Sequence, residues 1–218
     1  MTKISIKLLL FVFIFSPVSL YAQSLQIKVT SVHDGDTLNA IGVADSQKYK
    51  VRLMGVDTPE VDFYKNTQGA VALKARDVLR SLIPDGSIVT LSDDSQVDKH
   101  GRVLGRLLKD GLDVNKEMLK QGWGVIYFIY PFEKRIASDY SQAAKEAFDN
   151  KRGIFSNQYR GTEIPYQFRL RVRDQVGRNP VGDLELKKVV SPDDVEKIPV
   201  WKRVFFPDYE LAYKNGYN

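Results

Sequence analysis

Hydrophobic and polar residues alternate along the first part of the chain, as they do in β-strands that bury one face. The alternation predicts strands over residues 25–32, 37–43 and 48–53. Asp34-Gly35 stands between the first two runs, and Asp-Gly between alternating segments is a strong signal for a tight turn. Three short strands in succession form a meander, which commonly closes into a small barrel.

The hydrophobic period then lengthens to that of α-helices. Apolar residues recur at helical spacing over residues 66–83, 114–120 and 137–148, which predicts three helices. Two further strands are expected over residues 88–91 and 102–108, on either side of a polar loop. Five strands interrupted by three helices predict an α+β domain built on a small barrel.

The C-terminal part of the chain is less regular. Residues 168–173 alternate apolar residues with Arg169, Arg171 and Arg173, which predicts a strand with an arginine face. That face could follow a phosphate backbone, but charged faces more often point into solvent, and we favour solvent here. Residues 161–218 hold ten Lys and Arg against nine Asp and Glu, so they are not a basic tail. We treat them as a C-terminal extension whose structure the pattern leaves open.

The N-terminal segment has the composition of a secretory signal peptide. Lys3 and Lys7 precede an apolar run over residues 8–15, and Ser19-Leu20-Tyr21-Ala22 supplies a cleavage site after Ala22. The run is shorter than the roughly 20 residues that span a bilayer, and a proline follows it. We therefore expect residues 1–22 to be removed and the rest to be exported, to the periplasm or out of the cell, with no stable membrane association.

Composition adds two limits. The chain has no cysteine, so an exported fold must be held by its own core and by any bound metal rather than by disulfides. The formal net charge of +5 includes the two lysines of the signal segment. The positive balance that remains is mild. It helps association with a polyanion, but alone it identifies no partner.

Two aspartates stand at the edges of predicted strands, where side chains can converge. Asp36 and Asp57 offer hard oxygen ligands, and Thr58 can add its backbone carbonyl. Oxygen ligands without a His or Cys cluster favour Ca²⁺ over zinc. Either aspartate alone is as readily a turn residue, because acids are common in turns. The two together, flanking a strand that carries an arginine, favour a calcium site.

Three further charged residues suit the cleavage of a phosphodiester. Arg52 points away from the face that Val51 and Leu53 share, and its guanidinium fork matches two phosphate oxygens. Arg102 opens a later strand at the edge of a loop. Glu60 follows a proline and can orient or deprotonate a water when a metal and arginines share the site. Taken alone, each of the three is equally well an ordinary surface charge.

The aromatic run before Pro131 offers rings that could stack on a nucleic-acid base. Tyr127, Phe128 and Tyr130 are the candidates. Core packing of the apolar run over residues 125–129 is the alternative, and we expect it to hold for at least one of the rings.

The motifs together resemble one known family. They stand in the order and approximate spacing of the thermonuclease (staphylococcal-nuclease-like) family, and the resemblance covers residues 25–158. Each motif is weak by itself, but their ordered combination is specific. The motifs are Asp34-Gly35-Asp36-Thr37, Val51-Arg52-Leu53, Val56-Asp57-Thr58-Pro59-Glu60, Asp98-Lys99-His100-Gly101-Arg102 and Gln121-Gly122.

The resemblance implies a fold and an activity. The fold is an OB-like barrel of five strands with three helices, forming a nuclease domain over residues 23–160. The activity is calcium-dependent cleavage of DNA and RNA, in which the 5′ oxygen–phosphorus bond breaks and 3′-phosphates remain. Single-stranded or frayed substrates are expected to be preferred, and we expect a monomer.

The resemblance also implies roles for individual residues. The calcium ligands would be Asp36, Asp57 and Thr58, the catalytic residues Arg52, Glu60 and Arg102, and the substrate contacts Lys99 and Tyr130. His100, next to Lys99, is a further candidate substrate contact. Two positions depart from the family pattern, because His100 and Phe128 stand where tyrosines are usual, which puts nucleotide preference in doubt.

A second hypothesis is a catalytically silent OB-fold module that binds nucleic acid or protein. Related modules that have lost catalysis usually lack an arginine or the glutamate of the catalytic set. This chain retains Arg52, Glu60 and Arg102, which favours the enzyme.

Overall fold

The computed structural model describes residues 24–218, apart from the side chains of residues 93–95. The predicted signal segment, residues 1–22, lies outside the described residues, so its removal and the export of the chain stay predictions. Within the described part, no helix is long and apolar enough to cross a membrane.

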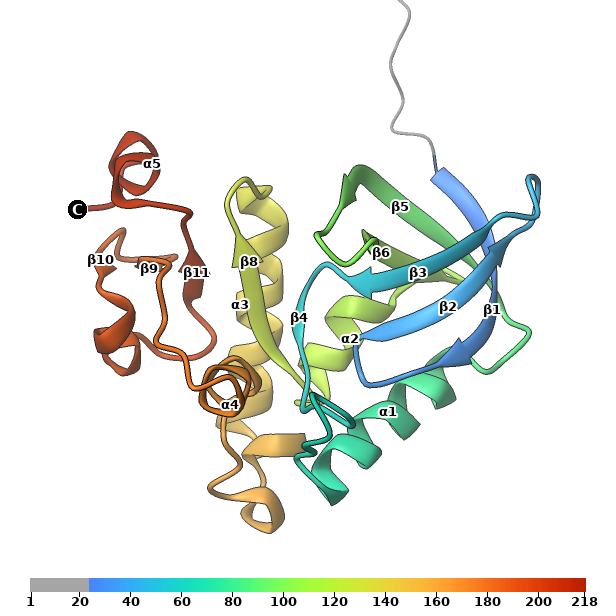
Figure 1. Cartoon of the computed structure of the whole chain (residues 1–218), viewed down its shortest axis with the longest axis horizontal. Helices are drawn as coiled ribbons and strands as arrows, with labels where there is room; N and C mark the ends of the chain where they lie inside the picture. Colours follow the sequence, from blue (N-terminus) through green and yellow to red (C-terminus); the bar gives the residue numbers. More distant parts are fainter. Residues whose placement is uncertain (1–23) are drawn as a thin grey trace, which may run out of the picture.

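Five strands close into a barrel on one side of the molecule (Figure 1). Their order is β3-β2-β1-β5-β6, and β6 closes the barrel by pairing in parallel with β3. The two-residue strand β7 extends the sheet beside β6. The predicted α+β fold on a five-stranded, OB-like barrel is confirmed. The strands are β1 (Ser24–Val32), β2 (Thr37–Gly42), β3 (Lys48–Leu53), β5 (Ile88–Val97), β6 (Val103–Lys109) and β7 (Leu112–Asp113).

Strand β5 is longer than the sequence pattern predicts. Its pairing with β6 runs from Thr90 opposite Leu108 to Val97 opposite Val103, with an irregularity on the way. The polar segment expected to form a loop after residue 91 is therefore largely strand. Backbone pairing with a neighbour is enough to hold it there, because the hydrogen bonds of a ladder do not require apolar side chains.

The three predicted helices form beside the barrel (Figure 1). The first packs its apolar face, which includes Leu79, into the core. The second is capped by Asp113, whose carboxylate accepts a hydrogen bond from the N–H of Lys116 at 3.0 Å. The third buries Tyr140 among alanines. The three are α1 (Ala70–Leu82), α2 (Val114–Lys120) and α3 (Lys134–Asp149).

A second sheet joins the barrel region to the C-terminal region, here defined as residues 161–218. Its strand order is β10-β9-β11-β8-β4. Strand β8 pairs antiparallel with β4 on one side and parallel with β11 on the other, so the C-terminal region continues a sheet that starts next to the barrel. The strands are β4 (Gly55–Asp57), β8 (Val125–Ile129), β9 (Val181–Asp183), β10 (Val189–Val190) and β11 (Arg203–Phe205), and the last helix is α5 (Tyr209–Lys214).

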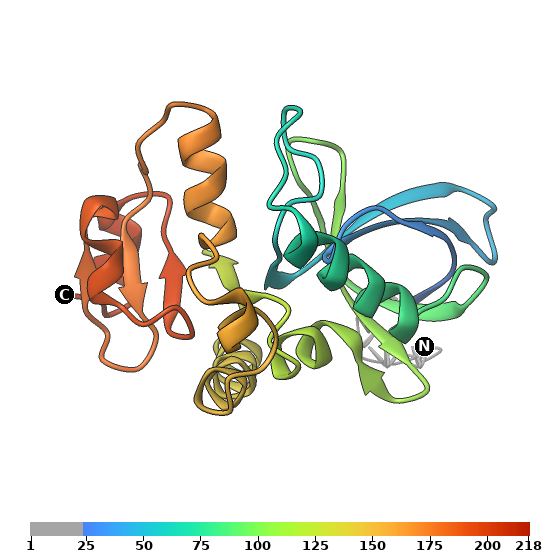
Figure 2. The ribbon, with the colours of Figure 1, turned by 90° about the horizontal axis from the view of Figure 1, so that it is seen from below.

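The strand predicted over residues 168–173 is wrong, because this segment belongs to helix α4 (Pro165–Val172). A proline in the first turn suits a helix start, since its missing N–H has no helical partner there. An alternation of only six residues does not distinguish a strand from a helix when some of the arginines pack inward as apolar residues do. Arg169 does so: its side chain is 16% exposed and points inward. Figure 2 shows α4 between the C-terminal strands and the barrel.

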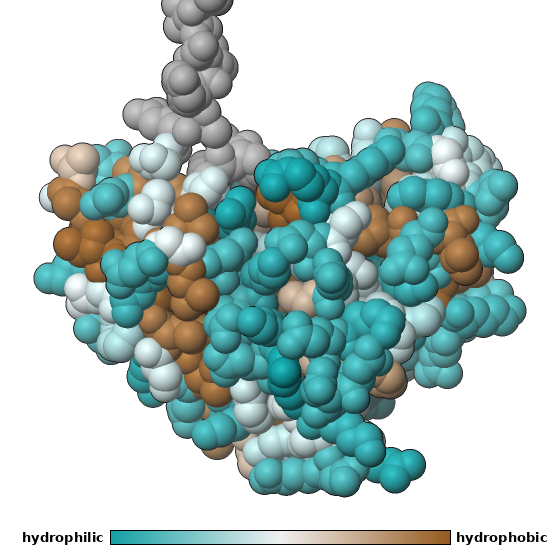
Figure 3. Space-filling model, turned by 180° about the vertical axis from the view of Figure 1, so that it is seen from behind, coloured by the Kyte–Doolittle hydropathy of each residue, from teal (hydrophilic) through white to brown (hydrophobic). Residues whose placement is uncertain are grey.

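The apolar core runs without a break from the barrel into the C-terminal region. Val204, Phe206 and Tyr217 belong to the same buried cluster as the barrel residues. Phe128 is also buried there, against Tyr140, so the core-packing alternative holds for this ring. The back of the molecule is largely hydrophilic, with brown hydrophobic positions on the barrel side, at the left of the view, and a second group at the right (Figure 3).

Truncating Phe206 should destabilise the whole chain. Its ring is fully buried and packs on Tyr130 at 5.7 Å and Tyr217 at 4.7 Å between ring centroids. We expect Phe206→Ala to lower the free energy of unfolding by about 3–5 kcal/mol, as core Phe→Ala changes do. Tyr213→Ala, at a 57% exposed position of α5, should change it by no more than about 0.5 kcal/mol. Urea titration measures both, and equal values would contradict a shared core.

Candidate active site

The turn before β2 and the end of β4 bring the predicted site residues together. Thr37 pairs with Arg52 across β2 and β3, and the N–H of Leu53 donates to the carbonyl of Asp36 at 2.8 Å. Gly35 allows this close approach, because a Cβ there would lie 2.7 Å from the hydroxyl of Thr58. The local sequence therefore places side chains from three elements at one point beside the barrel.

Arg52 is buried and binds both aspartates. Its Nη1 donates to Asp36, and its Nη2 donates to Asp57 Oδ1 at 2.7 Å and to the carbonyl of Val56 at 3.2 Å. Burial alone would lower the pKa of the guanidinium, but the two carboxylates outweigh it and raise the pKa. Arg52 is thus a fixed cation between the two predicted metal ligands.

Thr58 forms hydrogen bonds with the second carboxylate oxygen of Asp36. Its N–H and its hydroxyl both donate to Asp36 Oδ2, at 2.8 and 2.9 Å. Asp34 also lies in this cluster, where its carboxylate accepts from the N–H of Asp36 at 3.0 Å. Burial, and then the charge of Asp36, raise the pKa of Asp34 well above its usual value.

Glu60 and Asp57 share a partner that the sequence did not place in the site. Nη1 of Arg169 donates to Asp57 Oδ1 and to Glu60 Oε1, both at 2.7 Å, and its Nη2 donates to Asp57 Oδ2 at 3.0 Å. Burial would raise the pKa of Asp57, but the charges of Arg169 and Arg52 prevail and lower it. For Glu60, burial and the charge of Asp36 prevail and raise the pKa.

Arg102 stands at the edge of this cluster. Its side chain, 23% exposed, forms an ion pair with Asp98 at 2.7 Å, and its Nη1 lies 3.5 Å from the hydroxyl of Thr37. Burial would raise the pKa of Asp98, but hydrogen bonds from the backbone and side chain of Arg102 lower it. Lys99 and His100 are exposed in the turn that leads to Arg102.

Tyr130 does not join this group. It is half-buried just after β8, and its ring stacks on Phe206 of the C-terminal region with an interplanar angle of 23°. One face of the ring is therefore already covered by a residue of this chain.

The donor set fits a hard divalent cation in its chemistry. Four buried carboxylates, from Asp34, Asp36, Asp57 and Glu60, face two guanidinium groups, which leaves an excess of two negative charges when all are ionised. All the side-chain ligands are oxygens, as Ca²⁺ and Mg²⁺ prefer. In this structure Arg52 and Arg169 form ion pairs with these carboxylates. Among the described residues, no group of three or more His, Cys, Asp or Glu side chains has the geometry of a metal site.

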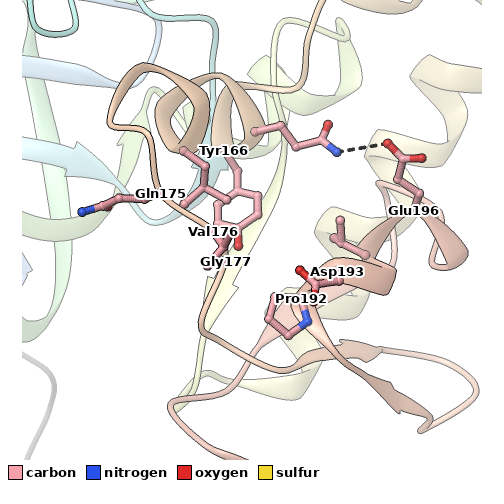
Figure 4. A pocket seen from close by; sticks show the side chains of 10 residues that line it. Tyr166, Gln175, Val176, Gly177, Pro192, Asp193 and Glu196 are labelled. Carbon is pink, nitrogen blue, oxygen red and sulfur yellow. Dashed lines mark hydrogen bonds between the residues drawn. The ribbon is translucent and has the colours of Figure 1, made fainter.

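A separate cavity of about 230 Å³ lies in the C-terminal region (Figure 4). Tyr166, Val176 and Pro192 are among its lining residues, and the amide of Gln167 donates to Glu196 at 3.3 Å at its rim. The lining includes none of the predicted site residues, so the cavity is not part of the acidic cluster.

Comparison with known proteins assigns this sequence to a family. Residues 50–157 match the staphylococcal nuclease homologue family. The matched segment contains Arg52, Asp57, Glu60 and Arg102, and Asp36 lies just before it. The chain belongs to the staphylococcal-nuclease-like family.

Relatives of known and unknown activity share parts of the chain. Endonuclease YhcR of Bacillus subtilis is 32% identical over 204 residues, which cover 87% of this chain and 16% of that protein. An uncharacterised protein of Bacillus anthracis is 32% identical over 136 residues, 62% of each chain. The thermonuclease of Staphylococcus hyicus is 29% identical over 133 residues, 60% of this chain and 75% of that one. The chain thus spans less than two thirds of the length of the first two relatives. The match to YhcR covers 87% of this chain, so it must extend into the C-terminal region.

Removing Arg52 should destabilise the protein most when no metal is present. Arg52→Ala leaves Asp36 and Asp57 buried without their shared cation, which typically costs about 3–5 kcal/mol. Added Ca²⁺ should restore part of the loss, because a bound cation stabilises the folded state by mass action. Urea unfolding in EDTA and in calcium measures both effects. Arg102→Ala, whose ion pair is partly exposed, is the control and should cost about 1 kcal/mol or less; equal losses would contradict the role of Arg52.

Proposed function

We propose that this protein is a calcium-dependent nuclease that hydrolyses phosphodiester bonds of DNA and RNA. The supporting observation is the gathering of Asp36, Arg52, Asp57 and Glu60 in one buried cluster with Arg102 at its edge. The names of the relatives, an endonuclease and a thermonuclease, support action on nucleic acids. Calcium and the 3′-phosphate product are the finer parts of the proposal, and they come from the family resemblance.

The residues divide the chemistry between them. Asp36, Asp57 and the carbonyl of Thr58 would hold the ion, which when bound adds positive charge beside the phosphate. Arg52 and Arg102 bind the phosphate oxygens and stabilise the extra negative charge of the five-coordinate transition state. Arg52 has five N–H donors and uses only part of them on Asp36, Asp57 and Val56, so donors remain for substrate.

Glu60 acts on the attacking water. Its carboxylate accepts the water proton or orients the molecule as the new bond to phosphorus forms. The 5′ oxygen then leaves, and the phosphate stays on the 3′ side. Burial raises the pKa of Glu60, which makes it a stronger proton acceptor than an exposed glutamate.

One assay tests the function directly. We expect residues 23–218 to cleave single-stranded DNA and RNA in Ca²⁺, to stop in excess chelator, and to leave 3′-phosphate ends. Product ends are identified by whether a phosphatase must act before the 3′ end can be extended. Absence of any chelator-sensitive product would overturn the proposal.

Arg102→Ala should lower kcat by roughly 10²–10³-fold while the fold survives, because it removes one group that stabilises transition-state charge. Arg106→Ala is the matched control, because Arg106 lies in β6, which directly follows Arg102, and pairs with Asp113 at 2.7 Å. Its kcat should stay within about threefold of the wild type. Rates on single-stranded DNA and far-UV circular dichroism check the pair, and similar losses in both variants would argue against a phosphate contact at Arg102.

One observation favours the second hypothesis, a silent binding module: Arg169 already engages Asp57 and Glu60. In that case the chain would bind single-stranded DNA in calcium and leave it intact. The cleavage assay, run beside a binding measurement on the same oligonucleotide, separates the two functions.

A further inference from the structure

Helix α4 brings a second arginine to the buried carboxylates of the candidate site, beside Arg52. The guanidinium of Arg169 meets both oxygens of Asp57 and one oxygen of Glu60, with all three contacts between 2.7 and 3.0 Å. Such a planar fork binds one carboxylate with two parallel bonds and can still reach a second, which a lysine cannot copy. The side chain of Asp57 is fully buried, so this contact is largely shielded from solvent.

We propose that Arg169 is a positioning residue of the active site, which holds the carboxylate of Glu60 in place beside Asp57 and balances the charge of Asp57. The inference rests on the nuclease function proposed above. It assigns to the C-terminal region a direct part in the site, through a residue that acts on Glu60 rather than on the substrate.

The side chain of Gln68 connects the backbone of Glu60 to the segment before α4. The amide oxygen of Gln68 accepts from the N–H of Glu60 at 3.0 Å, and its amide nitrogen donates to the carbonyl of Glu163 at 2.7 Å. Gln68 thus fixes the backbone of Glu60 relative to α4, while Arg169 fixes its carboxylate. Two independent contacts therefore hold the same residue, one at its backbone and one at its carboxylate.

Aromatic contacts strengthen this attachment. Phe63, in the loop after Glu60, lies 6.5 Å from Phe168 of α4, and the guanidinium of Arg173 lies 4.7 Å from the centre of the Phe63 ring. A cation over an aromatic face is attracted by the ring's charge distribution. These contacts join the loop after Glu60 to α4 and to Arg173 at its C-terminal end.

Arg169 itself has a rigid support. Its guanidinium lies 5.6 Å from the centre of the Tyr127 ring in β8, and that ring packs on Phe205 of β11 at 4.8 Å. Because β8 and β11 are paired in parallel, the support is part of the second sheet. A residue held on strands is positioned more precisely than one held on a free loop.

The proposal predicts two effects of opposite sign when Arg169 is removed. A cation on Asp57 competes with the guanidinium for the same oxygens, so metal binding should become tighter without Arg169. Glu60 loses the partner that orients it, so turnover should become slower. A general loss of structure would instead weaken both.

The test compares Arg169→Ala with Arg169→Lys and with Arg171→Ala. Arg171 lies on the same helix, but its side chain is 62% exposed and pairs with Glu163. Calcium binding is measured by titration calorimetry, and kcat and KM are measured on single-stranded DNA. For Arg169→Ala we expect calcium binding at least about tenfold tighter, because a unit charge within hydrogen-bond distance has been removed. We expect kcat to fall about 10–100-fold, as for other residues that orient a catalytic group, with KM within about threefold.

The other variants sharpen the result. Arg169→Lys keeps the charge and loses the fork, so its calcium affinity should stay near the wild-type value while kcat lies between those of wild type and Arg169→Ala. Arg171→Ala should change neither quantity by more than about twofold, as expected for an exposed ion pair. An unchanged or raised kcat in Arg169→Ala would mean that the arginine only blocks the metal site, and weaker calcium binding together with slower turnover would mean a purely structural role. Either result overturns the proposal.

Thermal unfolding in chelator gives an answer that does not need activity. Arg169→Ala, Glu60→Gln and the double variant form a cycle, and the shift in Tm of the double variant should be clearly smaller than the sum of the single shifts if the two side chains act on each other. Additive shifts would overturn the contact. A wild-type protein that cleaves nothing would overturn the proposed function, whereas the cycle would still decide whether Arg169 holds Glu60.

Discussion

Four carboxylates buried side by side are the constraint on which the rest of the structure depends. Asp34, Asp36, Asp57 and Glu60 would repel one another and lose their hydration, which is costly for any buried charge. Arg52 from the barrel and Arg169 from the C-terminal region compensate them from two sides. When all four are ionised, an excess of negative charge remains, and such an excess suits a divalent cation.

This constraint explains why the C-terminal region is part of the same body as the barrel. One of the two compensating arginines lies 112 residues after the aspartate it binds, so the region that carries it must be held precisely. Strand β8 provides the hold, because it pairs with β4, which ends at Asp57, and with β11 of the C-terminal region. The continuous apolar core serves the same end.

Much of the barrel and of the site could be predicted from local pattern. The strands over residues 37–43 and 48–53 alternate clearly, and Asp36, Arg52 and Asp57 stand at strand ends or edges, where side chains converge. The position of Arg169 could not be predicted in this way. Its segment alternates like a strand, and only tertiary contacts decide that it forms a helix whose arginine turns inward.

The aromatic residues before Pro131 also show what local pattern cannot predict. The sequence offers equivalent rings at Phe128 and Tyr130, yet Phe128 is core and Tyr130 stacks on Phe206. Phe128 packs on Phe132 and Tyr140, whereas the cover on Tyr130 comes from the C-terminal region, whose packing has no signature in the run itself. The barrel folded alone would therefore lack the arginine that binds the carboxylate of Glu60 and the ring that covers Tyr130. One region, residues 161–218, supplies both through Arg169 and Phe206.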